Sequence, residues 1–170
     1  MGDEKIQRRY FDYNATTPVA SEVLETMLPY LKESWGNPSS VYAFGHDMAK
    51  VIVESRESVA SLIGASPAEV VFTSCGTESI NTALWSGLKS DPAKRHVLMS
   101  AVEHPANLSF AETLEREGCR VTVLPVLESG VLDLNVVEEA IQSDTALLSV
   151  MWANNETGVV MPIGWPLPQH

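Results

Sequence analysis

The sequence contains few cysteines. Only Cys75 and Cys119 occur in 170 residues, and neither belongs to a CxxC pair or to a spacing typical of metal ligands. A disulfide scaffold and a metal site are therefore not expected, and the low cysteine content favours a reducing compartment such as the cytoplasm. The sequence also lacks an apolar signal core at its start and any run near the roughly 20 apolar residues of a membrane span.

Basic residues are scarce as well. The 11 Lys and Arg residues face 22 Asp and Glu residues, which gives a formal charge of −11. This balance disfavours nucleic acid or an anionic membrane as a partner. Neither a Gly-x-Gly-x-x-Gly nor a Walker sequence is present, so a generic nucleotide-binding domain is disfavoured. The apolar content of 45% is that of an ordinary globular protein.

From about residue 69 onward, short apolar runs alternate with helical patterns. Two helices are expected before this point, at 21–31 and at 45–62, the second ended by Gly64. The alternation predicts an α/β fold with a mostly parallel sheet and helices on both faces. The expected strands are 69–73, 96–101, 120–126 and 146–152, and the expected helices between them are 77–88, 105–117 and 134–142.

Polar motifs follow three of the predicted strands. Gly76 and Thr77 follow the first strand, His104 the second and Asn155 the last. The first N–H groups of a helix have no internal partner and carry partial positive charge, so the segment at Gly76 predicts a phosphate cradle. Because the carboxyl ends of parallel strands form one edge, the cradle, the imidazole and the carboxamide are predicted to share a pocket.

Each of these residues also has a purely structural interpretation. His104 alone is more often a structural histidine than a ligand contact. The Asn154-Asn155 pair alone is typical of a turn. Glu78 and Glu103 lie near expected helix starts, where a negative charge is favourable in any case.

Taken together, five motifs closely resemble those of cysteine desulfurases and the related selenocysteine lyases. These are pyridoxal-phosphate enzymes of the aspartate-aminotransferase fold. The resemblance runs from about Tyr10 to Ile163 and covers the amino-terminal part of the usual family length. The motifs are Tyr-Asn-Ala-Thr-Thr-Pro (13–18), Gly-Asn-Pro-Ser-Ser (36–40), Phe-Thr-Ser-Cys-Gly-Thr-Glu-Ser (72–79), Glu-His (103–104) and Asn-Asn-Glu-Thr-Gly (154–158).

The resemblance implies an organisation of the chain. Residues 1–18 are expected to form an amino-terminal segment. Residues 19–163 are expected to be part of the large domain that binds pyridoxal 5'-phosphate. Residues 164–170 form an atypical tail, because they contain two prolines where the βα rhythm leads us to expect a helix.

The resemblance also implies roles for single residues. Gly76 and Thr77 look like the cradle for the cofactor phosphate. His104 looks like the catalytic imidazole that stacks on the pyridine ring and relays protons, and Asn155 like the carboxamide that binds the phenolic oxygen. No metal is implied. The segment that approaches the substrate is expected to be Asn14, Ala15 and Thr16.

By this resemblance the whole enzyme converts L-cysteine to L-alanine and leaves a persulfide on the protein. The sulfur would go to an acceptor protein, for iron–sulfur clusters or thio-modified cofactors, and the enzyme would be a homodimer. One alternative is a selenocysteine lyase that acts on L-selenocysteine. The other is a non-catalytic fragment that binds a complete subunit.

The family's motifs for its Schiff-base lysine, its aspartate at the pyridine nitrogen and its nucleophilic cysteine are not found in the sequence. None of the five lysines has the Ser-x-His-Lys context, and neither cysteine matches the catalytic position. The isolated chain is therefore expected to be inactive. Cys75 stands where the family usually has glycine, and a positive φ there would cost about 1–2 kcal/mol.

Overall fold

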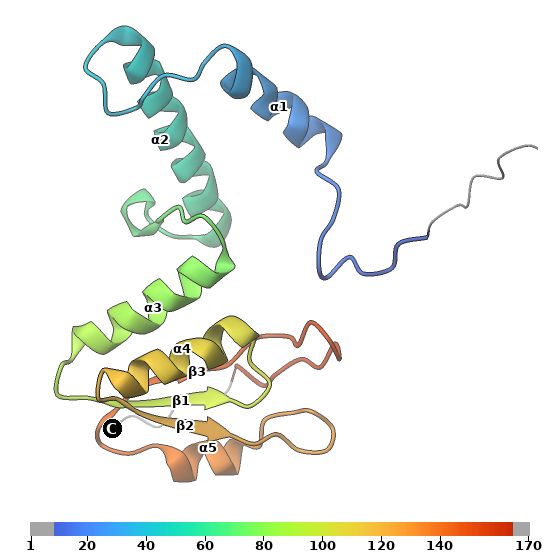
Figure 1. Ribbon diagram of the computed structural model, residues 1–170, viewed down its shortest axis with the longest axis vertical. Helices are drawn as coiled ribbons and strands as arrows, with labels where there is room; N and C mark the ends of the chain where they lie inside the picture. Colours follow the sequence, from blue (N-terminus) through green and yellow to red (C-terminus); the bar gives the residue numbers. More distant parts are fainter. Residues whose placement is uncertain (1–8, 165–170) are drawn as a thin grey trace, which may run out of the picture. The chain divides into compact units, whose positions relative to one another are not determined.

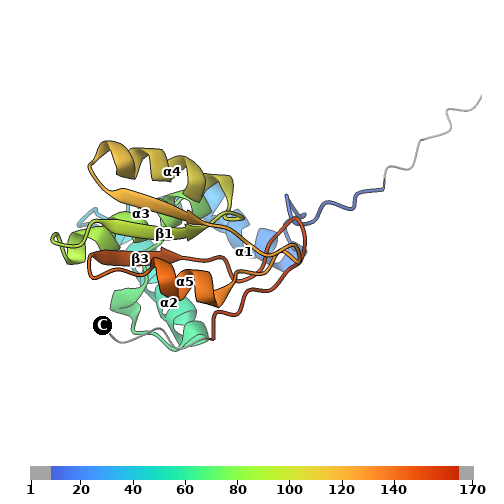
Figure 2. The same ribbon diagram turned by 90° about the horizontal axis from the view of Figure 1, so that it is seen from below.

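The central strand β1, His96–Ser100, is buried along its whole length. The computed structural model describes residues 9–164. In it, β1 pairs in parallel with β2, Arg120–Leu124, and with β3, Thr145–Ser149. The strand order is β2-β1-β3, as Figure 2 shows. A strand covered on both faces has a continuous apolar sequence, and the Val-Leu-Met run of β1 fits this.

Alternate residues of β1 point to opposite faces of the sheet. Val97 and Met99 pack in one cluster with residues of α3, Gly76–Ser90, and α4, Pro105–Arg116. Leu98 packs on the other face with Val137 of α5, Leu134–Ala140. Figure 1 shows α4 and α5 on the two sides of the strands. The predicted α/β fold with a parallel sheet and helices on both faces is confirmed.

The chain forms two units, Met1–Phe72 and Thr73–His170. In the first unit, α1 covers Ser21–Lys32 with Pro29 inside it, and α2 covers Ala43–Ile63. Gly64 ends α2 with φ 68°, as the sequence predicts. None of the helices among the described residues combines the length and apolar character needed to span a membrane. The expected domain bounds stay a prediction, and residues 165–170 of the tail lie outside the described residues.

The strand expected at 69–73 is wrong. Pro67–Glu69 instead forms the short 3-10 helix η1, closed by a capping box in which Ser66 Oγ accepts from Ala68 N and Glu69 Oε2 accepts from Ser66 N. Val70 is extended, with φ −97° and ψ 123°. However, no strand within residues 9–164 pairs with this segment. The other predicted helices and strands are present, with ends that differ by a few residues.

Candidate active site

The amino-terminal end of α3 has open space beside its backbone. The helix begins at Gly76, and a Cβ added to Gly76 would meet nothing within 4 Å. Packing inside the protein therefore does not require glycine at this position, and φ of Gly76 is not positive. A site that holds an anion at a helix start needs this close access to the backbone N–H groups.

Cys75 is the N-cap residue of α3 and is exposed. Its φ of −167° is extended backbone that any residue adopts, so the strain considered for this position does not arise. The pKa of the Cys75 thiol is lowered, first by the nearby backbone N–H of Glu78, then by the Ser74 hydroxyl, which donates to the sulfur at 3.7 Å, and by the backbone N–H of Thr77. The same N–H groups that favour a phosphate here therefore also favour a thiolate.

Glu78 stabilises the turn that leads into α3. Its Oε2 accepts hydrogen bonds from Ser74 Oγ at 2.5 Å and from Ser74 N at 2.6 Å. These bonds, the one from the hydroxyl first, lower the pKa of the Glu78 carboxyl. The structural interpretation of Glu78 therefore holds, and its carboxylate is occupied by the backbone and side chain of Ser74.

His104 is the N-cap residue of α4. Its Nδ1 accepts a hydrogen bond from Ala106 N at 3.1 Å. The ring proton of the neutral side chain is therefore on Nε2, and the bond fixes the orientation of the ring. The residue is exposed, so the ring is both capped and accessible.

Thr77 and His104 line the same hollow, of about 410 Å³, between α3 and the start of α4. We call it the α3–α4 hollow. Asn81 also lines it, and the Oδ1 atom of Asn81 is buried without a hydrogen-bond partner among the described residues. A buried acceptor without a partner is uncommon in a folded protein.

Asn155 lies in the turn that follows β3, and the turn is held by its neighbour. Asn154 Oδ1 accepts from Glu156 N and from Thr157 N, both at 2.9 Å. Asn154 Nδ2 donates to the carbonyl oxygen of Val102 at 3.2 Å. The turn that carries Asn155 is thus tied to the segment just before His104. Asn155 itself is exposed, with its Nδ2 donating to Glu156 Oε1 at 2.8 Å.

The structure therefore brings Thr77 and His104 to one hollow and ties the turn of Asn155 to the loop of His104. Asn14, Ala15 and Thr16 belong to the first unit. There the N–H groups of Ala15 and Thr16 donate to the Asp12 carbonyl, at 3.1 and 3.4 Å. Their role in substrate binding stays a prediction.

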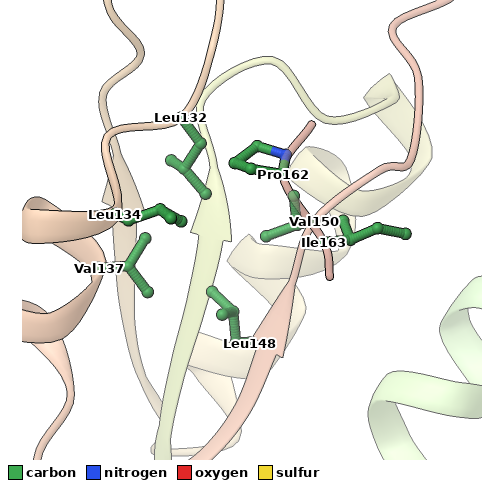
Figure 3. Close-up of a pocket in the computed structure, with 7 residues that line it drawn as sticks. All are labelled: Leu132, Leu134, Val137, Leu148, Val150, Pro162 and Ile163. Carbon is green, nitrogen blue, oxygen red and sulfur yellow. The ribbon is translucent and has the colours of Figure 1, made fainter. Parts of the chain in front are cut away.

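A second hollow, of about 210 Å³, lies beside α5 and the end of β3. Figure 3 shows the apolar side chains of Leu134, Val150 and Ile163 around it. All the residues that line it are apolar, so it offers no side-chain group that could bind a phosphate or move a proton. The α3–α4 hollow, by contrast, is lined by polar side chains that include Thr77 and His104.

The sequence did not reveal the importance of Glu103 and Asn154. Glu103 is only 6% exposed, although its position suggested no more than a favourable charge near a helix start. Asn154 provides the hydrogen bonds of its turn, while Asn155 is presented to solvent. The Asn-Asn pair signalled a turn, and the pattern of polar residues after an apolar strand could have drawn attention to Glu103.

Comparison with known proteins supports the resemblance. The chain belongs to the class-V aminotransferase family, whose model matches residues 9–164. It is 50% identical, over 154 residues, to "Cysteine desulfurase 2" of Trichormus variabilis, with 91% of this chain and 39% of that protein covered. The chain thus spans about two fifths of the length of this relative.

Two solved structures are also similar. A "NifS-like protein" matches with a TM-score of 0.87 and 40% identity, over 92% of this chain and 43% of the other. "SspA in complex with cysteine" matches with a TM-score of 0.83 and 39% identity, over 92% of this chain and 45% of the other. The expected kinship with cysteine desulfurases is confirmed.

Proposed function

We propose that this chain forms part of the pyridoxal-phosphate site of a cysteine desulfurase. Class-V aminotransferases depend in general on this cofactor. The observation that carries the proposal is the α3–α4 hollow, which Thr77 and His104 line together next to the open backbone of Gly76. The orphaned Oδ1 of Asn81 in the same hollow is consistent with a ligand that brings a donor.

The residues present fit the cofactor. The backbone N–H groups at the start of α3 and the Thr77 hydroxyl would hold the phosphate. The His104 ring, fixed through Nδ1, would lie against the pyridine ring and hold a proton at Nε2. The Asn155 carboxamide would donate to the phenolic oxygen. The bound cofactor supplies an electron sink for the amino-acid substrate, and the protein supplies orientation and electrostatics.

The whole protein would then catalyse L-cysteine plus a protein thiol to L-alanine plus a protein persulfide. The similarity to "Cysteine desulfurase 2" and to "SspA in complex with cysteine" supports this reaction. It also makes a selenocysteine lyase or a non-catalytic fragment less favoured. A homodimer, an acceptor protein and a cytoplasmic location belong to the same proposal. We expect no turnover by the 170-residue chain alone, because no family motif for the Schiff-base lysine or the nucleophilic cysteine is found in it.

The binding proposal can be tested with 4'-deoxypyridoxine 5'-phosphate, which has the cofactor's ring and phosphate but no aldehyde. Lysines at the surface therefore cannot trap it. Calorimetric titration of the chain should show binding, and pyridoxine, which lacks the phosphate, should bind much more weakly. Thr77→Val removes one hydrogen-bond donor and should lower the affinity for the phosphorylated probe by about threefold to tenfold.

Two further variants sharpen this test. Gly76→Ala places a methyl group in the open space at the cradle and should also weaken the probe, without loss of stability. Ser90→Ala, at the other end of α3, removes a hydroxyl that donates to the Ser86 carbonyl. It should leave the affinity unchanged. Equal affinities for pyridoxine and 4'-deoxypyridoxine 5'-phosphate, or equal effects of Thr77→Val and Ser90→Ala, would contradict the proposed cradle.

A further inference from the structure

A single buried carboxylate connects the segments that carry the candidate site. Glu103 is 6% exposed and accepts four hydrogen bonds. Its Oε1 accepts from Ser100 Oγ at 2.8 Å and from Met151 N at 2.7 Å. Its Oε2 accepts from Asn107 Nδ2 at 2.5 Å and from Ser149 Oγ at 3.3 Å.

These donors come from different parts of the fold. Ser100 ends β1, Asn107 lies in the first turn of α4, Ser149 ends β3, and Met151 begins the segment that leads to Asn155. Because β3 ends at Ser149, the N–H of Met151 lies beyond the strand, and the carboxylate acts as its acceptor. Glu103 thus replaces the missing strand contact where the two site segments leave the sheet.

No cationic side chain in the described part of the chain pairs with this carboxylate. The ion pairs within residues 9–164 are Lys50–Glu54 and Arg120–Asp144, and neither involves Glu103. A buried charge is expensive unless its hydrogen bonds are satisfied. Here four neutral donors satisfy the carboxylate oxygens. Glu103 therefore provides one of the links between the segment that follows β1 and the segment that follows β3.

We propose that Glu103 is a positioning residue for the proposed cofactor site, and this inference rests on the proposed function. It holds the His104 loop against the segment that leads to Asn155, so that the imidazole and the carboxamide face the same ligand. The bond from Asn154 Nδ2 to the Val102 carbonyl is a second tie between the same two segments. Glu103 itself does not line the α3–α4 hollow.

Glu103→Gln tests the proposal with little change in side-chain size. In either orientation, the new amide NH2 faces a group that only donates, the Met151 N–H on one side or the Asn107 NH2 on the other. Asn107 Oδ1 has no partner among the described residues. A flip of the Asn107 amide would therefore relieve one clash, but it would remove the hydrogen bond from Asn107 Nδ2 to Ser149 Oγ. The variant should therefore fold, but the contact between the His104 loop and the segment that leads to Asn155 should be weaker.

The first measurement needs no ligand. Long-range proton–nitrogen NMR of the 170-residue chain should show His104 in the Nε2–H tautomer, and Glu103→Gln should give a mixture of the two tautomers. Thr145→Val is the matched control, because it removes a partly buried hydroxyl at the opposite edge of the sheet. It should reduce stability and leave the His104 tautomer unchanged. Ser100→Ala, which removes one of the four donors, should act like Glu103→Gln to a smaller extent.

The second measurement separates the ring from the phosphate. Glu103→Gln should lower the affinity for 4'-deoxypyridoxine 5'-phosphate by about threefold to tenfold, because the contact with the ring is lost. The affinity for inorganic phosphate should stay unchanged. An unchanged tautomer in Glu103→Gln and in Ser100→Ala overturns the positioning role, and so does an equal tautomer change in Thr145→Val. If the unmodified chain fails to bind the probe, the proposed function is wrong. The tautomer measurement, which needs no ligand, still tests whether Glu103 positions His104.

Discussion

Acid should destabilise this fold through one buried histidine. His96 is fully buried at the start of β1, and its ring lies between two hydroxyl groups. Nδ1 is 2.8 Å from Thr145 Oγ1 on β3, and Nε2 is 2.9 Å from Thr122 Oγ1 on β2. One side chain therefore joins all three strands at the edge opposite the candidate site.

The pKa of His96 is lowered from its ordinary value of 6.5, first by burial and then by the positive charge of Arg120, while Asp144 acts in the opposite direction. Below about pH 6.5 the unfolded chain takes up the proton more readily than the folded chain does. The stability contributed by neutral His96 is therefore complete above about pH 6.5, and it is lost as the pH falls from there through the folded-state pKa. One proton limits the slope to about 1.4 kcal/mol per pH unit.

The test compares the chain with His96→Gln, whose amide can donate to one threonine and accept from the other but does not titrate. Urea unfolding, followed by circular dichroism, should be measured between about pH 7.5 and 5.5, above the range of most carboxylates. The free energy of unfolding of the unmodified chain should fall more steeply than that of the variant. Parallel curves for the two proteins would refute the argument that burial of a neutral His96 is the cause.

Two further predictions concern packing and backbone. Leu98→Ala removes a fully buried side chain from the α5 face of the sheet and should lower the free energy of unfolding by about 2–5 kcal/mol. Val123→Ala, at a residue that is 50% exposed, should change it by about 1 kcal/mol or less, and similar losses would contradict the assigned core. Gly158→Ala should lower the free energy of unfolding by about 1–2 kcal/mol, because φ is 74°. No atom lies within 4 Å of the added Cβ, so the loss would come from the backbone conformation alone. Gly76→Ala, without a positive φ, should change stability by less than about 0.5 kcal/mol, and thermal melts of both glycine variants check this contrast.

The sequence was sufficient for the sheet because its signals are local or follow from chain geometry. The Val97–Met99 run predicts a buried strand, and the βα alternation predicts parallel pairing with β2 and β3. The strand expected at 69–73 failed for the complementary reason. Val70 does have extended dihedral angles, but a strand also requires a neighbour that supplies hydrogen bonds, and a propensity pattern carries no information about that neighbour.

The same limit explains why Glu103 was not recognised. A glutamate just before a helix start is favoured by charge alone, and nothing in its own neighbourhood indicates burial. Two of its donors, Ser149 and Met151, lie 46 and 48 residues further along the chain. Their meeting with Glu103 depends on the parallel pairing of β1 with β3, so it becomes visible only after the sheet has formed.

The candidate site therefore divides its work between two kinds of residue. His104 and Asn155 are exposed, whereas Glu103 is buried and Asn154 is partly buried. Glu103 and Asn154 connect the loop after β1 with the turn after β3 through hydrogen bonds. The segment that carries each exposed group is thus held by the residue that directly precedes that group in the chain. A substitution at Glu103 should therefore alter ligand binding at a distance, while a substitution at His104 removes the contact itself.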